Sequence, residues 1–340
     1  MKKAIYLIIS ILVLSTNACK NNGKFLPSIT GGAFEVLVVV DNNTWKSSAG
    51  RKLFDLLNQS MPCMPQPEPY FSISRTTPEG FTSLLKPTRN IIQVEISEKY
   101  TQTKIQFIKD KWAAPQSLIK IVTPNDSAFI NLIQEKGEEI IDYFVVAERE
   151  RQLTYLKGFS NNEAISRVEK KFGISINIPT NINKYKEDKN VLWMSTGSGK
   201  VRQDIVIYTY PYTDKNTFTP EYLLRKRDSV LKVTIPGPAK NSYMTTEYKI
   251  PPIFKEVWAE NRYCAEIRGL WKVEGDFMGG PFVSHTRLDE INQRIITVEG
   301  FVYAPGSNKR SYIRQMEAIL YSLKLPLQLN EVVVSAKKKK

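Results

Sequence analysis

The stretch Phe34-Glu35-Val36-Leu37-Val38-Val39-Val40-Asp41 marks where the folded body begins. Apart from Glu35 it is an apolar, mostly β-branched run, which is typical of a strand buried on both faces of a sheet. A helix pattern follows at once, and Asn43 or Thr44 can cap it. A buried strand followed by a helix predicts that an α/β unit opens the first domain.

The rest of the first half continues this alternation after a proline-rich interruption. Met61 to Pro69 has proline at four of nine positions, which fixes φ and removes backbone donors, so we expect an extended loop there. Asn125 precedes an amphipathic pattern that predicts a long helix continuing through Arg151. Strands are expected at residues 70–75, 90–96 and 117–123.

The second half carries longer strand patterns, and the polar stretch Gly158–Asn162 separates it from the first. Long consecutive strands favour an antiparallel sheet. Helices are expected at residues 163–172, at 221–232 and from 308 or 309, and strands at 174–178, 191–196, 204–210, 242–248, 263–273 and 294–303. The predicted fold class is α+β: two consecutive α+β domains, residues 33–158 and 159–325, the second with a mainly antiparallel sheet.

The first residues predict export and a lipid anchor. A short basic start precedes the apolar run Ala4–Leu14, which is typical of a signal peptide over residues 1–18. The sequence before Cys19 resembles a lipobox, in which cleavage precedes a lipidated cysteine; the other interpretation is a secretory signal with a chance cysteine. Residues 19–32 then form the lipidated cysteine and a flexible tether. The predicted location is the cell envelope, lipid-anchored at the outer membrane.

The charge balance is basic, with a formal net charge of +14 and four lysines at the end of the tail formed by residues 326–340. A nucleic-acid partner would call for a concentrated Lys/Arg stripe with interleaved aromatic residues, which the sequence lacks. The basic residues therefore either solvate the surface or favour an anionic lipid or glycan.

Beyond Cys19 the chain has two cysteines, Cys63 and Cys264. An exported protein can keep a disulfide, but a sequence cannot show whether two Cα atoms lie within bridging distance. A disulfide and two free thiols both remain open.

The densest candidate site lies between Trp258 and Tyr303, where aromatic residues alternate with charged ones. An aromatic-lined cleft with a few polar groups can hold a sugar or a peptide, although aromatic residues also simply pack a sheet. The residues expected to bind a ligand are Arg268, Trp271, Asp276 and His285.

The same region also offers candidate catalytic residues. Glu274 and Asp276 form a candidate carboxylate pair, and His285 is the only histidine of the chain. A single histidine excludes a multi-histidine metal site, and we expect neither a metal nor a cofactor. Glu274, Asp276 and His285 are thus the candidate catalytic residues of an alternative hydrolase interpretation.

Several blocks of the sequence resemble the DUF4837 family of Bacteroidetes envelope lipoproteins, over nearly the whole body. The resemblance implies an envelope address and an architecture, and it implies no reaction. The blocks are Arg89–Ile91, Trp112–Gln116, Arg227–Asp228, Ile235–Pro238, Ser242–Met244, Arg268–Trp271, Gly275–Phe282 and Gly300–Pro305.

Together these patterns predict a non-catalytic binding or assembly protein of the envelope. Its partners would be the membrane, through the lipid anchor, and a glycan, peptide or envelope protein bound on the second domain. The alternative is a hydrolase acting on an envelope glycan or peptide.

We predict that Cys19→Ala abolishes membrane retention, because the sequence offers no second anchor of comparable strength. Cell fractionation after labelling with a fatty-acid analogue measures this. Label remaining on the mutant protein, or an unchanged membrane fraction, would contradict the lipid anchor.

Overall fold

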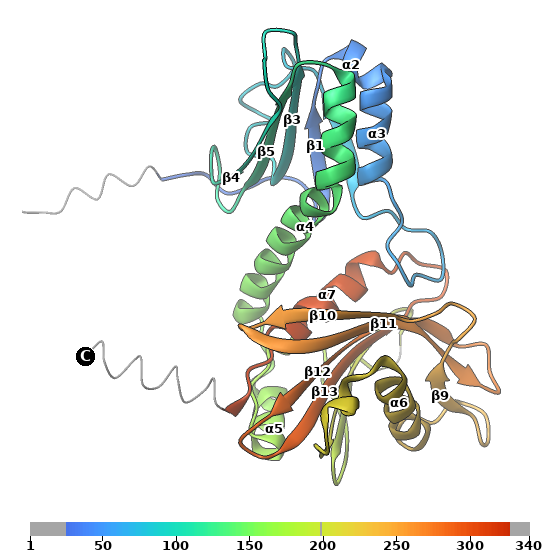
Figure 1. Ribbon diagram of the computed structural model, residues 1–340. Coiled ribbons are helices and arrows are strands. Elements are labelled where there is room, and N and C mark those ends of the chain that lie inside the picture. The colour runs from blue at the N-terminus through green and yellow to red at the C-terminus, as the bar shows by residue number, and fades with distance from the viewer. Residues whose placement is uncertain (1–24, 198, 327–340) are drawn as a thin grey trace, which may run out of the picture.

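The computed structural model describes residues 25–197 and 199–326, and within them the chain folds into two α+β domains in series. Figure 1 shows one domain above the other, with helix α4 (Asp126–Gly158) running from the upper sheet to the lower one. The signal peptide, Cys19 and the basic tail from residue 327 lie outside the described residues. No helix of the described part is long and apolar enough to cross a membrane.

The first domain is built on a five-stranded sheet in the order β2-β1-β3-β5-β4. Neighbouring strands are parallel except β4, which is antiparallel to β5 at the edge. The strands are β1 (Glu35–Val39), β2 (Ser72–Thr76), β3 (Asn90–Ile96), β4 (Lys104–Lys109) and β5 (Ser117–Thr123).

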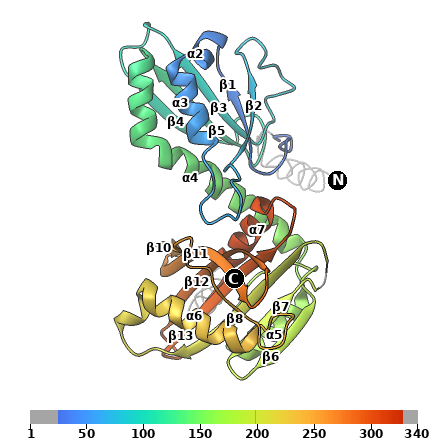
Figure 2. The same ribbon diagram turned by 90° about the vertical axis from the view of Figure 1, so that its right-hand side faces the viewer.

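Helices cover one face of this sheet and loops cover part of the other. Figure 2 shows α3 (Ser48–Leu57) and α4 together against the sheet, where they bury the main apolar core of the domain. Asp41, rather than Asn43 or Thr44, caps the short helix α2 (Asn42–Lys46), because its carboxylate accepts from two backbone N–H groups. The opposite face is covered by a smaller cluster that includes Phe81 and Trp112.

Residues 27–30, expected to belong to the flexible tether, are instead part of the first domain. The backbone of Thr30 donates to Pro87 and accepts from Arg89, and Pro27 accepts from the N–H of Ala114. The tether expectation was wrong for these residues because strand-like pairing supplies their backbone with partners, which a polar composition does not reveal.

The second domain is an eight-stranded antiparallel sheet in the order β10-β11-β12-β13-β8-β7-β6, with β9 pairing against the second half of β11. Its strands are β6 (Lys184–Asp188), β7 (Val191–Ser195), β8 (Arg202–Pro211), β9 (Tyr243–Thr246), β10 (Ile253–Ala259), β11 (Arg262–Glu274), β12 (Gly279–Asp289) and β13 (Arg294–Tyr303). The mainly antiparallel sheet predicted for this domain is confirmed.

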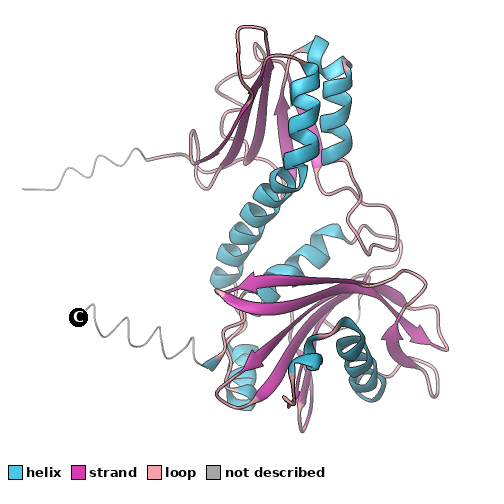
Figure 3. Cartoon of the chain, in the orientation of Figure 1, coloured by secondary structure: helices cyan, strands magenta, loops and turns pink. Residues whose placement is uncertain are grey.

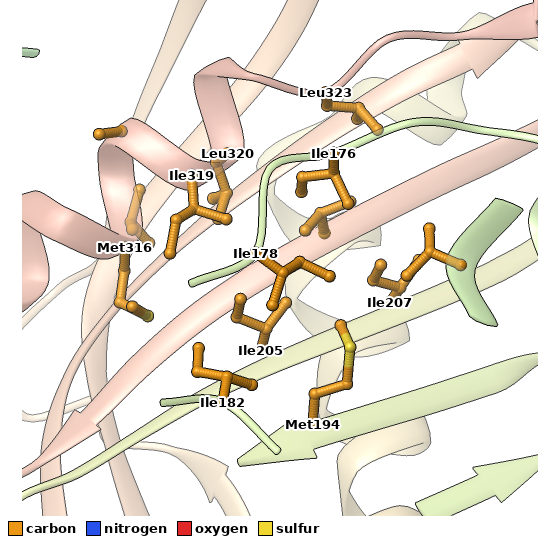
Figure 4. Close-up of a cluster of buried hydrophobic side chains, with 14 of the residues drawn as sticks. Ile176, Ile178, Ile182, Met194, Ile205, Ile207, Met316, Ile319, Leu320 and Leu323 are labelled. Carbon is orange, nitrogen blue, oxygen red and sulfur yellow. The ribbon is translucent and has the colours of Figure 1, made fainter. Parts of the chain in front are cut away.

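Helices and one irregular segment close both faces of the second sheet. Helix α6 (Pro220–Thr234) covers one face, next to the short 3-10 helix η1 (Lys215–Phe218). Helices α5 (Asn162–Phe172) and α7 (Arg310–Tyr321) belong to the core on the other face. Figure 4 shows side chains of α7, β7 and β8 meeting Ile176, Ile178 and Ile182 in this core.

The strand expected at residues 174–178 does not form. Ile174, Ile176 and Ile178 are buried at alternating positions as in a strand. Their backbone, however, bonds to the end of the chain: Ser175 N–H donates to the Lys324 carbonyl at 3.0 Å. The alternation of apolar residues therefore predicted their burial correctly. It did not predict that their backbone pairs with the end of the chain and not with a sheet.

Four strands were missed, and each departs from the usual strand composition. The edge strands β4, β6 and β10 carry several charged residues, since edge strands face water. Strand β12 begins Gly279-Gly280-Pro281, which favours a turn in a sequence-based reading.

The proline-rich loop joins the two domains. It is irregular, as predicted, and Figure 3 shows it descending from the upper domain to the lower one. Met61 and Met64 enter the core of the second domain. The carboxylate of Glu68 accepts from the backbone N–H groups of Lys309 and Arg310, at 2.7 and 2.8 Å, and so caps α7.

We predict that a chain beginning at Lys24 folds, and that one beginning at Gly32 loses about 2–4 kcal/mol of unfolding free energy, because three backbone hydrogen bonds are removed at roughly 0.5–1.5 kcal/mol each. Urea titration measures the difference. A chain beginning at Pro27 is the matched control, since it keeps all three bonds. Equal stability for all three chains would contradict the prediction.

Candidate functional site

The predicted site on the second domain is divided between the two faces of the sheet. Trp271 is buried, with 2% of its surface exposed, among the side chains packed under α6. Its indole N–H donates to the Val302 carbonyl at 3.2 Å, and its ring packs edge-on against Phe301. Trp271 is therefore a core residue, and the expectation that it lines a ligand cleft was wrong.

Arg268 and His285 lie on the opposite face, beneath α7. Arg268 is paired with Glu266 at 2.8 Å and with Glu317 of α7 at 2.7 Å. His285 Nε2 lies 2.9 Å from Glu266, and no part of the imidazole is exposed. Both side chains are held in this network beneath α7, in which His285 Nδ1 makes no hydrogen bond to a described residue, so they are not positioned to receive a ligand.

Glu274 and Asp276 lie at the turn between β11 and β12. Asp276 Oδ1 accepts from the Met278 N–H at 3.0 Å, and Glu274 pairs with Lys272 at 3.1 Å on the surface. His285 is six residues further along β12 than Gly279, which corresponds to about 20 Å of strand. The three candidate catalytic residues are therefore not brought together in one place.

The ion pairs beneath α7 shift the pKa values of the residues that form them. Burial alone would lower the pKa of His285, but the neighbouring Cys264 and Glu266 raise it to about 9. Burial would raise the pKa of Glu317, yet Arg268 and Arg314 lower it to about 2. Both groups are thus charged at neutral pH, and each shift comes from a structural ion pair.

The two remaining cysteines are both free. Cys264 is buried beside His285, whereas Cys63 in the proline-rich loop is half-buried and directs its thiol at the Arg268 carbonyl, 3.4 Å away. The question left open by the sequence is answered in favour of two free thiols.

An open cleft lies on the first domain, at the carboxyl ends of its parallel strands. Parallel α/β sheets commonly bind ligands at this edge. The hollow has a volume of about 460 Å³, which is enough for a small molecule. This sheet cleft is lined by Val39, Asp41, Pro78, Glu79, Phe81, Gln93, Val94, Glu95, Lys120 and Ile121.

The sheet cleft has an apolar floor and a charged rim. Val39 and Phe81, which pack together on the loop-covered face of the sheet, supply the apolar floor. Burial would raise the pKa of Asp41, but hydrogen bonds from Thr44 and Asn43 lower it. Hydrogen bonds from Lys99 and Tyr100 lower the pKa of Glu95. Both carboxylates are therefore ionised at neutral pH.

One cation stands among these carboxylates. Lys120 projects from β5, and its side-chain ammonium makes no hydrogen bond or ion pair with any described residue. Glu79, from the loop after β2, is exposed. The lining of the cleft thus carries three carboxylates and one ammonium group, and one of the carboxylates, Glu95, is already bonded to Lys99 and Tyr100. No group of His, Cys, Asp or Glu among the described residues could hold a metal ion.

Sequence reasoning missed this cleft, although a signal was present. Asp41 follows directly on the buried strand β1, and side chains at the carboxyl end of a central parallel strand face a shared edge. Recognising that β3 lies parallel beside β1, and β5 parallel beside β3, would have added Glu95 and Lys120 to the same site.

The fold and the cleft define a two-domain α+β protein with a ligand-sized cleft on its N-terminal domain. Residues 161–322 match the family model described as domain of unknown function DUF4837, and residues 29–157 match domain of unknown function DUF8532. The second domain is therefore a DUF4837 domain. The blocks Arg89–Ile91 and Trp112–Gln116 fall within the DUF8532 match. None of the curated proteins matches the chain.

We predict that the unfolding free energy falls between pH 6.5 and 9, by less than the roughly 3 kcal/mol that His285 would contribute alone because the lowered pKa of Cys264 acts in the opposite direction, and that His285→Gln removes this fall. The pKa of His285 is raised to about 9 in the folded protein, so protonated His285 stabilises the fold. This stabilisation is complete below the pKa of the unfolded chain and is lost as the pH rises through the pKa of the folded protein. Urea titrations across this range measure it.

His285 is the only histidine, so no other imidazole contributes to this change. The same pH dependence in the mutant and the parent chain would contradict the prediction.

Proposed function

We propose that this chain is a lipid-anchored envelope protein that binds, without chemical conversion, a small ligand carrying both an amine and a carboxylate. An amino acid or the end of a peptide is such a ligand. The sheet cleft of the first domain is the proposed binding site, in place of the second-domain site expected from the sequence.

The observation that carries this proposal is the charge arrangement of the sheet cleft. Asp41, Glu79 and Glu95 can accept hydrogen bonds from an ammonium group, and Lys120 can pair with a carboxylate. The apolar floor of Val39 and Phe81 excludes water from part of the ligand. A ligand with only an amine would leave Lys120 without a partner, and a ligand with only a carboxylate would leave Glu79 without one.

The envelope address of the proposal rests on the N-terminal sequence. The apolar run Ala4–Leu14 and the lipobox-like residues before Cys19 support export and lipidation. In that arrangement the folded body begins eight residues after Cys19, at Pro27, so the first domain is the part nearest the anchor.

The hydrolase alternative has less support. Glu274 and Asp276 sit on an exposed turn, while His285 is sealed beneath α7. General acid–base catalysis needs a group within hydrogen-bonding reach of the substrate. These three residues offer no common place for a substrate.

We predict that the dipeptide lysyl-alanine binds the full chain and that Asp41→Asn and Lys120→Gln each weaken binding about tenfold, since a charged hydrogen bond contributes roughly 1.5–3 kcal/mol. Isothermal titration calorimetry measures the affinity. Asparagine caps a helix as well as aspartate does, so Asp41→Asn removes the charge and keeps α2.

Glu98→Gln is the matched control, because Glu98 is an exposed carboxylate on the same domain outside the sheet cleft. The dipeptide acetylated on both amines should bind poorly. Equal affinity for the two dipeptides, or equal losses in all three variants, would rule out the proposed site.

A further inference from the structure

The edge strand β4 carries a row of free backbone groups. The Ser117 N–H donates to the Arg89 carbonyl, next to β3, and the Gln116 carbonyl accepts from the Asp110 N–H, next to β4. The backbone groups of successive β5 residues therefore point alternately toward β3 and toward β4. The register then directs Lys104, Gln106 and Ile108 toward β5. The N–H and C=O groups of the intervening residues point outward, and no other strand of the described chain pairs there. These residues are Ile105, Phe107 and Lys109.

A groove runs beside this row, between β4 and α4. One hollow of about 290 Å³ is lined by Phe107, Lys109, Glu139, Asp142, Tyr143, Val146, Ala147 and Glu150. A second hollow of about 230 Å³ shares Lys109, Ala147 and Glu150 with it and continues past the β4–β5 turn. We call the first hollow, together with the outer side of β4, the edge groove. Figure 1 shows β4 at the outer side of the upper sheet.

The edge groove is apolar in the middle and acidic at both ends. Val146 is 37% exposed and lies between Asp142, one turn before it, and Glu150, one turn after it. Glu139 extends the acidic end. Lys109 pairs loosely with Glu150 at 3.6 Å, and an exposed pair of this kind contributes little stability.

These dimensions suit an extended peptide. Residues 139 to 150 of α4 span about 16 Å. Three strand residues at positions i, i+2 and i+4 lie on one face and span about 14 Å. A strand added to β4 would thus place its middle side chain at Val146 and its outer two near the acidic ends.

We propose that the edge groove binds an extended segment of another protein, in which an apolar residue lies between two basic residues at alternating positions. The segment adds a strand to β4 through Ile105, Phe107 and Lys109. Its apolar side chain packs on Val146 and Phe107, and its basic side chains pair with Glu150 and with Asp142 or Glu139. This surface is separate from the sheet cleft.

The first test uses the peptide acetyl-Lys-Thr-Val-Thr-Lys-amide with the full chain. Val146→Lys places a cation in the middle of the edge groove and should weaken binding at least tenfold. Gln134→Lys is the matched control, because it adds the same charge at an exposed position of α4 outside the groove. It should change affinity less than twofold. The peptide acetyl-Glu-Thr-Val-Thr-Glu-amide should bind at least tenfold more weakly.

The second test separates strand addition from simple charge attraction. On binding, amide hydrogen exchange should slow at Ile105, Phe107 and Lys109, whose N–H groups point outward. Exchange at Gln106 and Ile108 should stay as it was, because those amides are already bonded to β5.

Three results would overturn the proposal. Equal losses in Val146→Lys and Gln134→Lys would show attraction to the overall charge. Binding without slower exchange at Phe107 would exclude strand addition. Protection of the same amides in the free chain at high concentration, with dimers in sedimentation, would mean that a second copy occupies the edge.

Discussion

The position of helix α7 is the constraint on which the arrangement of the two domains depends, and a buried chain of ion pairs holds it. Glu317 binds Arg268 of the second sheet at 2.7 Å and Arg314 of its own helix at 2.8 Å. Arg314 in turn lies over the rings of Phe34 and Tyr70, which belong to the first domain. Removing one partner of a buried ion pair leaves an uncompensated charge, which typically lowers the unfolding free energy by about 3–5 kcal/mol. Each of these contacts therefore depends on the others. Helix α7 is thus fixed from the sheet below and from the domain above.

Two further contacts tie the first domain to the same helix. Glu68 caps the N-terminus of α7 from the proline-rich loop. At the other end, Arg149 of α4 stacks on Tyr321, with its guanidinium carbon 3.6 Å from the ring centroid. Binding surfaces therefore remain where no interdomain contact is made, on the carboxyl edge of the first sheet and along β4. In the second domain, Trp271 and His285 lie in its own core, and Arg268 pairs with Glu317 of α7 at this junction.

These roles in the core and at the domain junction explain why the residues predicted to bind a ligand are not accessible to one. Arg268, Trp271 and His285 have the side-chain types that are common in binding sites. A sequence cannot distinguish a charged side chain that is free to bind a ligand from one that is paired inside the protein. The pairing partner Glu317 lies 49 residues from Arg268. Asp41, Glu95 and Lys120 are less conspicuous in the sequence, but parallel pairing of their strands brings them to one edge.

By itself, the sequence determined the local structure: the buried strand at Phe34–Val40, the long helix after Asn125, the α+β class and the antiparallel character of the second sheet. These follow from side-chain periodicity and capping, which act over a few residues. Only the tertiary structure decided that Ile174–Ile178 lies beside Lys324 instead of in a sheet, that residues 27–30 belong to the first domain, and which charged groups are free. The physical reason is that backbone partners and ion-pair partners are chosen between segments far apart in the chain, where the local pattern of neither segment records the choice.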